Sequence, residues 1–483
     1  MKLGSTSMLI ILSIVVAYIV LTGYLSIRWS GKTNSDFMTG SRGLPTIVVG
    51  VLMMSQFVGA VTLVGTAQSA FTSGVAALWS VLAAVIGFIV YGVCIAKKLY
   101  RTGGFTISGV LESKFGPSTK YIVSIIMIYA LFLTNVANYI SGASILSTIL
   151  GLDLHVAMIV VGIVGTFYFC IGGMKSVAYV TMIHTFIKYL GLIVTLVVAL
   201  ILTHGLTPVM HGLPHYYFTS TGQIGWGTIV GWIITSIGSI FSTQYILQAM
   251  TSSKNEKSAQ RATFVAAGLA LPLVAVLPLI GVCARYLFPK INSLYALPVF
   301  LSHMNVFVAA FVATGLLAAV FIAISALSLG AVSLIVEDFY VPHWKPEPKQ
   351  QLKTTRIISV VVGLLPLVFA SITPQILSMS FFTKAVRVSI AIVAVVAFYL
   401  PHFTDTRGAN ISLVGTVIIA TGWFILGDPF GINDVYVALL TPLIIMGGYR
   451  LFVRPTAKAA DKEKKSAMVS VSAVTEKTQE KDD

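Results

Sequence analysis

The sequence predicts an all-α polytopic membrane protein with about 13 transmembrane helices. Three observations predict this class. Hydrophobic side chains make up 57% of the 483 residues and charged side chains only 10%, whereas a soluble domain carries about 25% charged residues. Apolar runs recur along the chain, each close to the roughly 20 residues that cross a bilayer. Gly, Pro or charged residues separate these runs. The composition and the recurring apolar runs together exclude a soluble fold.

The predicted spans follow one another from the N-terminus. They cover residues 8–28, 45–72, 77–96, 121–150, 155–172, 177–203, 224–250, 262–284, 305–336, 357–374, 384–401, 410–427 and 433–453. The tenth and eleventh are the least clearly separated, and twelve spans is the alternative count. The first run is too long for a signal peptide and has no small-residue cleavage site after it, so we expect a span there. Three cysteines lie inside apolar runs and predict neither disulfides nor a metal site.

Basic residues predict the orientation of these spans. Alternate loops carry seventeen Lys and Arg residues, and the segment from Arg450 to Lys481 carries eight more, whereas the opposite loops and span ends hold five. Because Lys and Arg concentrate in cytoplasmic loops, we expect the N-terminus outside and the C-terminus in the cytoplasm. Topology also accounts for the net charge of +15, so we expect no nucleic-acid partner. Residues 456–483 are polar and predict a disordered tail.

Two spans are interrupted by glycine and polar residues, at residues 51–65 and 231–245. Such interruptions at corresponding places in two halves indicate an inverted-repeat transporter, because irregular backbone at membrane depth persists only where it lines a cavity. The alternative is that Gly and Ser merely allow close helix packing. The predicted units are residues 1–44 (first span and loop), 45–222 (first repeat), 223–405 (second repeat), 406–455 (two further spans) and 456–483 (tail).

Six segments, in the same order along the chain, resemble the sodium:solute symporter family. They are DFMTGSRGLP (36–45), SQFVG (55–59), TISGVLESKFG (106–116), GGMKSVAYVTMIH (172–184), QYILQ (244–248) and the stretch from AAV (318–320) to EDFY (337–340). The resemblance implies a five-plus-five inverted-repeat (LeuT-like) core. It also implies cation-coupled symport of a small solute across the cell membrane by alternating access to a midplane site. Relatives of this kind carry proline, pantothenate, sialic acid and sugars.

The resemblance fails at the sodium site. In the family, this site consists of backbone carbonyls of the broken second span and two adjacent hydroxyls on the ninth span. The ninth span has no hydroxyl at either matching position, because Ile322 and Ala323 stand there. Ser325 and Ser328 would supply hydroxyls only if that span were shifted. No Asp or Glu lies at membrane depth in any predicted span. The degenerate sodium site implied by the resemblance comprises Val49, Leu52, Ala319, Ile322 and Ala323.

Lys188 is the candidate that replaces sodium. It stands eleven residues into the sixth predicted span, which at about 1.5 Å per residue puts it near the bilayer middle. An ionisable residue there marks an ion or substrate pathway by default. Thr181, His184 and Lys188 share one helix face, and in proton-coupled relatives of the same fold a lysine on this helix puts its ammonium where sodium would sit. The alternatives are a lysine that only holds helices together and a histidine that only packs.

Candidate solute contacts are polar groups that the fold would place at the midplane. All are neutral: Gln56 on the second span, Thr134, Asn135 and Asn138 on the fourth, and Thr235, Ser239 and Gln244 on the seventh. Leu78 stands where sugar carriers of the family place a carboxylate. Lys384 and Arg387 begin the eleventh predicted span, where they would either attract an organic anion from outside or anchor the helix at the outer interface.

The resulting hypothesis is a secondary transporter of a small polar metabolite, in which proton coupling or sodium independence replaces sodium symport. The alternatives are sodium symport, as in the family, and a channel or uniporter without a coupling ion. An enzyme is disfavoured, because the sequence shows no pair of membrane acids, no Ser-His arrangement and no His cluster at metal spacing. We therefore expect no cofactor and no bound metal beyond a coupling ion.

Overall fold

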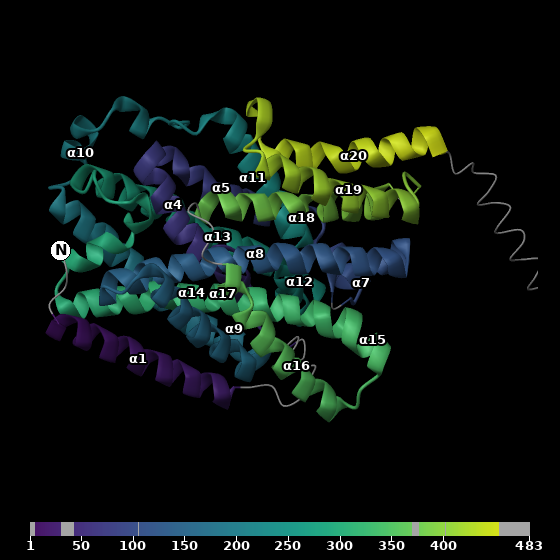
Figure 1. The fold of residues 1–483 in the computed structure, drawn as a ribbon, viewed down its shortest axis with the longest axis horizontal. Coiled ribbons are helices and arrows are strands. Elements are labelled where there is room, and N and C mark those ends of the chain that lie inside the picture. Colours follow the sequence, from purple (N-terminus) through teal and green to yellow (C-terminus); the bar gives the residue numbers. More distant parts are fainter. Residues whose placement is uncertain (1–4, 30–42, 105, 370–375, 401, 454–483) are drawn as a thin grey trace, which may run out of the picture.

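The computed structural model describes residues 5–29, 43–104, 106–369, 376–400 and 402–453, and within them the fold is a helical bundle without a strand. The start of α1 (Ser5–Arg28) and α10 (Leu206–Gly212) lie at one end of the bundle, which we call the α10 end. The opposite, α15 end holds α7 (Ile107–Phe115) and α15 (Val341–Trp344) (Figure 1). Residues 36–42 of the first motif and the tail 456–483 lie outside the described residues.

The remaining elements alternate between the two ends. The first half contains α3 (Thr46–Phe57), α4 (Ala60–Ser73), η2 (Val75–Leu78), α5 (Trp79–Cys94), α6 (Ala96–Arg101), α8 (Pro117–Leu150), α9 (Leu154–Leu202) and η3 (His215–Phe218). The second half contains α11 (Gly225–Ser242), α12 (Gln244–Thr251), α13 (Glu256–Leu287), η4 (Ser293–Tyr295), η5 (Pro298–His303), α14 (Val306–Leu334), η6 (Ile335–Tyr340), α16 (Pro348–Leu364), α17 (Pro366–Phe369), α18 (Ile376–Tyr399), α19 (Thr406–Ile425), η8 (Pro429–Gly431) and α20 (Asp434–Val453).

Among the described residues, eleven helices are long and apolar enough to cross a membrane, and twelve if a bent pair counts as one span. The bent pair is α3 and α4, which meet at 50°. A shorter apolar segment, Leu154–Phe167, lies at the predicted fifth position. It continues into the sixth predicted span through Gly173, whose φ of 65° breaks the helix inside α9 and is easy only for glycine.

Both predicted interruptions are confirmed. The second span breaks at Val58 and Gly59, between α3 and α4. The seventh breaks at Thr243, whose ψ of 127° separates α11 from α12. At each break backbone groups lose their helical partners, so the chain presents polar backbone at membrane depth.

Helix α14 occupies the centre of the bundle, where it packs against α1, α8 and α9. Its sequence is apolar on every face, which is typical of a helix that is buried all round. Helix α18 is almost as buried, and it begins at Ile376 rather than near Lys384 as predicted. The prediction of its start was wrong because the charged Lys384 was read as a span boundary.

Candidate transport site

Lys188 reaches the break in the second span. Its side chain is fully buried, and its ammonium donates to the carbonyl oxygen of Val58 at 3.4 Å and to Ser55 Oγ at 3.3 Å. Ser55 is also bonded to Thr185, one turn before Lys188. Val58 is the C-cap of α3, so the cation sits at the negative end of that half-helix dipole. The ion pairs among the described residues do not include Lys188.

Helix α14 meets the same break with apolar groups. A Cβ built on Gly59 would lie 2.8 Å from the Ala323 methyl, so position 323 packs directly against the break. Ile322 lines a small cavity formed with α1 and α9. Ser325 lines that small cavity, and Ser328 accepts a hydrogen bond from Asn135 on α8. Among the described residues, neither serine is hydrogen-bonded to Lys188.

The expected carbonyl donors lie elsewhere than at the break. Val49 and Leu52 are buried inside the regular helix α3, which ends at Phe57. In a regular helix these carbonyls accept intrahelical bonds. Ala319 lies on the buried α14 one turn before Ala323. Helix α3 runs past Val49 and Leu52, and the break follows at Val58 and Gly59.

The contact between Gly59 and Ala323 leads to a prediction. Gly59→Ala is expected to push α14 away from the break, since an added methyl at 2.8 Å from Ala323 is too close for van der Waals contact. Overpacking of this kind costs about 1–3 kcal/mol. Thermal unfolding and uptake assays would measure the loss, and adding Ala323→Gly should restore both. If the double variant remains as impaired as Gly59→Ala, the contact is not the cause.

His184 and Thr181 lie on the same helix face as Lys188 and line the small cavity between α1, α9 and α14. His184 Nδ1 is hydrogen-bonded to the hydroxyl of Tyr18 on α1. Thr181 is buried beside it. The three candidates therefore form a row that leads from this cavity to the break.

A second polar cavity, which we call the central cavity, lies on the other side of the break. Predicted solute contacts Gln56, Thr134 and Asn138 line it. Both amide atoms of Gln56 and the Asn138 Oδ1 atom are buried without a hydrogen-bond partner among the described residues. The Thr134 hydroxyl is instead within hydrogen-bond distance of Ala130 O at 2.7 Å and of Thr383 Oγ1 at 2.9 Å. Buried polar atoms are almost always paired, so unpaired amides facing a cavity suggest a ligand.

Lys384 and Arg387 also line the central cavity, which corrects the expectation of an outer anchor. Lys384 is 5% exposed and Arg387 is 1% exposed. Arg387 Nη1 donates to Thr243 Oγ1 at 2.9 Å, at the second break, and its Nε donates to Thr383 O at 3.0 Å. The Lys384 ammonium lies over the rings of Phe57 and Phe381, 5.0 and 4.3 Å from their centroids. Because α18 starts earlier than predicted, both cations lie well inside it.

Four predicted solute contacts are absent from the described lining of the central cavity. Asn135 Nδ2 donates to Ser328 at 2.9 Å and lines a different, apolar cavity. Thr235 and Ser239 donate to carbonyls of their own helix. Gln244 accepts from the Ile107 N–H at 2.9 Å and donates to Ser333 at 3.1 Å. The spacing of residues along a helix could not predict these contacts, because each helix packs against several neighbours on different faces. Sequence reasoning also missed Thr62, Tyr245 and Ser380, which line the cavity.

A vestibule of about 560 Å³ opens beside the α10 end, above the central cavity. Its lining includes Gln68 on α4, Asn292 and Asp434, and its inner wall includes Trp232 and Phe381. These two rings stack, with centroids 4.8 Å apart. Because the Lys384 ammonium lies under Phe381, the aromatic pair separates the vestibule from the central cavity.

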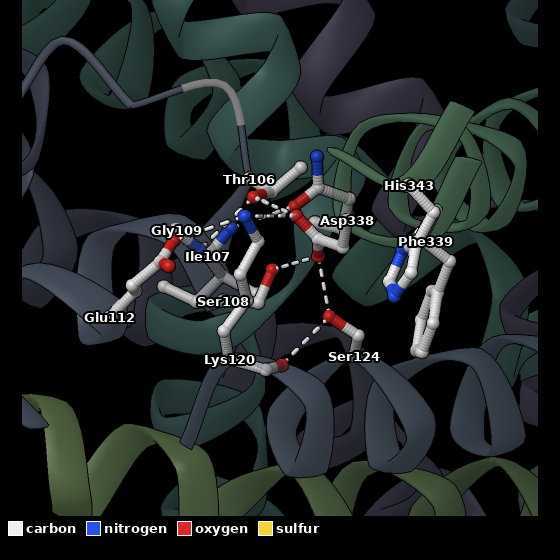
Figure 2. Close-up of polar contacts among 11 residues, drawn as sticks. Thr106, Ile107, Ser108, Gly109, Glu112, Lys120, Ser124, Asp338, Phe339 and His343 are labelled. Carbon is white, nitrogen blue, oxygen red and sulfur yellow. Dashed lines mark hydrogen bonds and ion pairs between the residues drawn. The ribbon is translucent and has the colours of Figure 1, made fainter. Parts of the chain in front are cut away.

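At the α15 end, Asp338 lies among polar side chains that include Thr106, Ser108 and Ser124 (Figure 2). Its buried carboxylate accepts hydrogen bonds from Thr106 Oγ1 at 3.0 Å and from the hydroxyls of Ser108 and Ser124. The ammonium of Lys120 lies 3.9 Å away. These contacts tie η6, at the end of α14, to α7 and α8. Two of the motifs that were matched to the family by sequence therefore meet here.

A helical bundle in which two broken spans meet a polar cavity has the architecture of a LeuT-like membrane transporter. A solved structure described as "Substrate-bound outward-open state of a Na+-coupled sialic acid symporter reveals a novel Na+-site" shares this fold with a TM-score of 0.80. That match covers 91% of this chain and 97% of the other, at 16% identity. Residues 37–416 match the sodium:solute symporter family, and the chain belongs to it.

Relatives are transporters as well. The High-affinity proline transporter PutP of Bacillus subtilis (strain 168) is 25% identical over 374 residues, which cover 73% of this chain and 78% of that protein. The Sodium/iodide cotransporter of Homo sapiens is 28% identical over 179 residues, which cover 37% of this chain and only 28% of that protein. The chain thus belongs to a family of membrane symporters, and its described part holds eleven helices long and apolar enough to cross a membrane.

Proposed function

We propose that the ammonium of Lys188 takes the place of a coupling sodium ion, so that this symporter is sodium-independent and driven by protons. The proposal includes the thirteen-span topology with the N-terminus and the α10 end outside, and residues 45–222 and 223–405 as the two inverted repeats. In this orientation the vestibule opens outward, and the Asp338 cluster closes the cytoplasmic side.

The contact between Lys188 and Val58 supports the proposal most directly. Transporters of this architecture bind coupling cations at unwound carbonyls and at the C-terminal ends of half-helices. The Lys188 ammonium occupies such a position, 3.4 Å from the carbonyl oxygen of the α3 C-cap. A charged lysine at membrane depth is costly, and such a residue marks an ion or substrate pathway by default.

The neighbouring side chains support sodium independence. Sodium is a hard cation, and a hard cation needs several oxygen ligands. At the break, α14 presents the methyl of Ala323 instead of a hydroxyl. Only Ser55 Oγ and Val58 O lie within hydrogen-bond reach of the ammonium among the described residues. Two oxygens suit an ammonium better than a bare ion.

Proton exchange at Lys188 would change how freely the break between α3 and α4 bends. A protonated Lys188 holds Val58 and Ser55, and so fixes α3 against α9. Loss of the proton removes a charged donor from these bonds, which weakens them. The break between α3 and α4 is then freer to bend, and bending of broken spans is how this architecture changes access. His184 and Thr181 line the cavity through which a proton would leave towards the α15 end.

Proteoliposomes that contain the full chain test this function. Uptake of radiolabelled lactate, glucose and proline would be followed under an imposed proton gradient in sodium-free buffer, and under a sodium gradient at constant pH. We expect the transported solute to accumulate with the proton gradient only, and purified protein to show no saturable ²²Na⁺ binding. Accumulation with sodium alone would instead support the sodium symport that names of relatives suggest, such as the Sodium/iodide cotransporter of Homo sapiens.

A further inference from the structure

The geometry points to a hydroxylated organic anion as the solute. Its carboxylate would bind Lys384 and Arg387, and its hydroxyl groups would face Gln56 and Asn138 in the central cavity. This inference deepens the proposed function, and it rests on that function for the transport cycle but not for binding.

The charge of the central cavity favours an anion. Lys384 and Arg387 are both buried and both line the central cavity. The ion pairs among the described residues involve neither of them, and the described lining of the cavity contains no Asp or Glu. Buried charges are normally paired, because an unpaired charge loses its hydration without compensation. An anionic ligand would supply the missing charge.

The backbone at the start of α4 also favours an anion. Helix α4 spans fourteen residues and begins at Ala60, and its N-cap, Gly59, provides no side-chain hydrogen bond. Gly59, Val61 and Thr62 line the central cavity, so the first turn of α4 faces the same space as the two cations. Free N–H groups and the helix dipole make such an N-terminus favourable for a carboxylate. The half-helix therefore adds to the attraction of Lys384 and Arg387.

The amide groups that face the central cavity indicate the rest of the ligand. Asn138 Nδ2 donates to Thr134 O at 3.2 Å, while its Oδ1 has no partner among the described residues. The side-chain amide oxygen and nitrogen of Gln56 also have no hydrogen-bond partner among the described residues. A ligand that pairs with these atoms would donate hydrogen bonds as well as accept them, which chloride or iodide cannot do. An ammonium group would meet repulsion from two cations, so hydroxyl groups are the donors that fit.

A solute must pass from the vestibule into the central cavity to reach the two cations. The central cavity is only about 20 Å³ in this conformation, room for about one water. Phe381 and Phe57 lie against the Lys384 ammonium and must move before a solute reaches it. Asp428 and Asp434 line the vestibule, so an anion must also pass two carboxylates. The Asp428 carboxylate accepts the Asp434 N–H at 3.1 Å, which offsets part of its charge.

Equilibrium binding to the purified full chain tests the inference without any ion gradient. Two matched series serve as probes. Glycerate is compared with serine, propionate and glyceramide, and gluconate with glucosaminate, hexanoate and glucose; sodium iodide tests a simple inorganic anion. Isothermal calorimetry and ligand-induced shifts in unfolding temperature report binding. We expect glycerate or gluconate to bind at least about tenfold more tightly than its amino, deoxy or neutral counterparts.

Variants of the two cations separate a ligand role from a structural one. Lys384→Gln and Arg387→Lys should weaken hydroxy-acid binding by about 10- to 100-fold, since the first loses the charge and the second loses the planar fork. Without ligand, Lys384→Gln should unfold at a higher temperature than the wild type, because an uncompensated buried charge is removed. Lys290→Gln, on the exposed surface at the α10 end, is the matched control and should change neither property.

Several results would overturn the inference. They are equal binding of serine or glucose, binding of iodide alone, no binding by any probe, or a lower unfolding temperature for ligand-free Lys384→Gln. None of them bears on proton coupling, because the assay contains no gradient and leaves Lys188 intact. Failure of the gradient experiment would likewise leave the solute class untouched.

Discussion

Replacing Lys188 with alanine is expected to abolish solute accumulation driven by a proton gradient. The ammonium is the charged group that bonds Val58 O at the break, so its loss removes the proton-binding group and takes this donor from Val58 O, while Ser55 keeps its bond to Thr185. Lys188→Arg is the sharper variant, because a guanidinium keeps the positive charge but does not release its proton. We expect it to stop gradient-driven accumulation while the protein still binds its solute. Proton-driven uptake by proteoliposomes measures both variants against the wild type.

A reconstruction of the sodium site extends this prediction. Lys188→Ala combined with Ile322→Ser and Ala323→Ser removes the ammonium and restores the adjacent hydroxyl pair that the family resemblance implies. We expect saturable ²²Na⁺ binding to appear in this triple variant. The control keeps Lys188 and carries only the two serines, and it should not bind sodium because the ammonium still occupies the place. Sodium binding by that control, or by the wild type, would contradict the replacement hypothesis.

Asp338→Ala is expected to produce the largest loss of stability. The carboxylate is 1% exposed, and it accepts hydrogen bonds from hydroxyls on α8 and at the start of α7. Its removal leaves three hydroxyls without that acceptor and Lys120 without one of its two carboxylate neighbours. Breaking one side of a buried charged network costs about 3–5 kcal/mol. Thermal unfolding in detergent measures this loss.

Two comparisons define what the Asp338 result means. Asp338→Asn keeps the shape and part of the hydrogen bonding, so its loss should lie between those of the wild type and Asp338→Ala. Glu256→Gln breaks the exposed pair with Arg101 and should have little effect, since solvent screens it. If Asp338→Ala unfolds at the wild-type temperature, the cluster does not hold α7, α8 and α14 together.

Much of the architecture could be predicted from the sequence because membrane spans are encoded locally. Twenty apolar residues cross a bilayer wherever they stand, and the interruptions at Gly59 and Thr243 were visible as glycine and polar residues in two apolar runs. Lys188 could be identified for the same reason, because a charged residue within an apolar run is recognised from the local sequence alone. The start of α18 was mistaken because the same local rule treats a charge as a boundary.

The central cavity could not be predicted in this way. Thr243 and Arg387 are 144 residues apart, yet they form a hydrogen bond of 2.9 Å. Gln244 and Asn135 looked like solute contacts by depth, but packing turned them towards Ile107 and Ser328. Hydropathy gives the depth of a residue and not the direction of its side chain, and two helices rotated differently would expose other groups.

The sequence by itself determined the class of protein, the number and order of apolar runs, the two broken spans and the presence of a lysine at membrane depth. Only the tertiary structure decided that Lys188 meets the first break, and that Lys384 and Arg387 share a cavity with Gln56 and Asn138. The reason is physical. Burial in a bilayer depends on local composition, whereas a binding site depends on the rotation and register of helices that pack from distant parts of the chain.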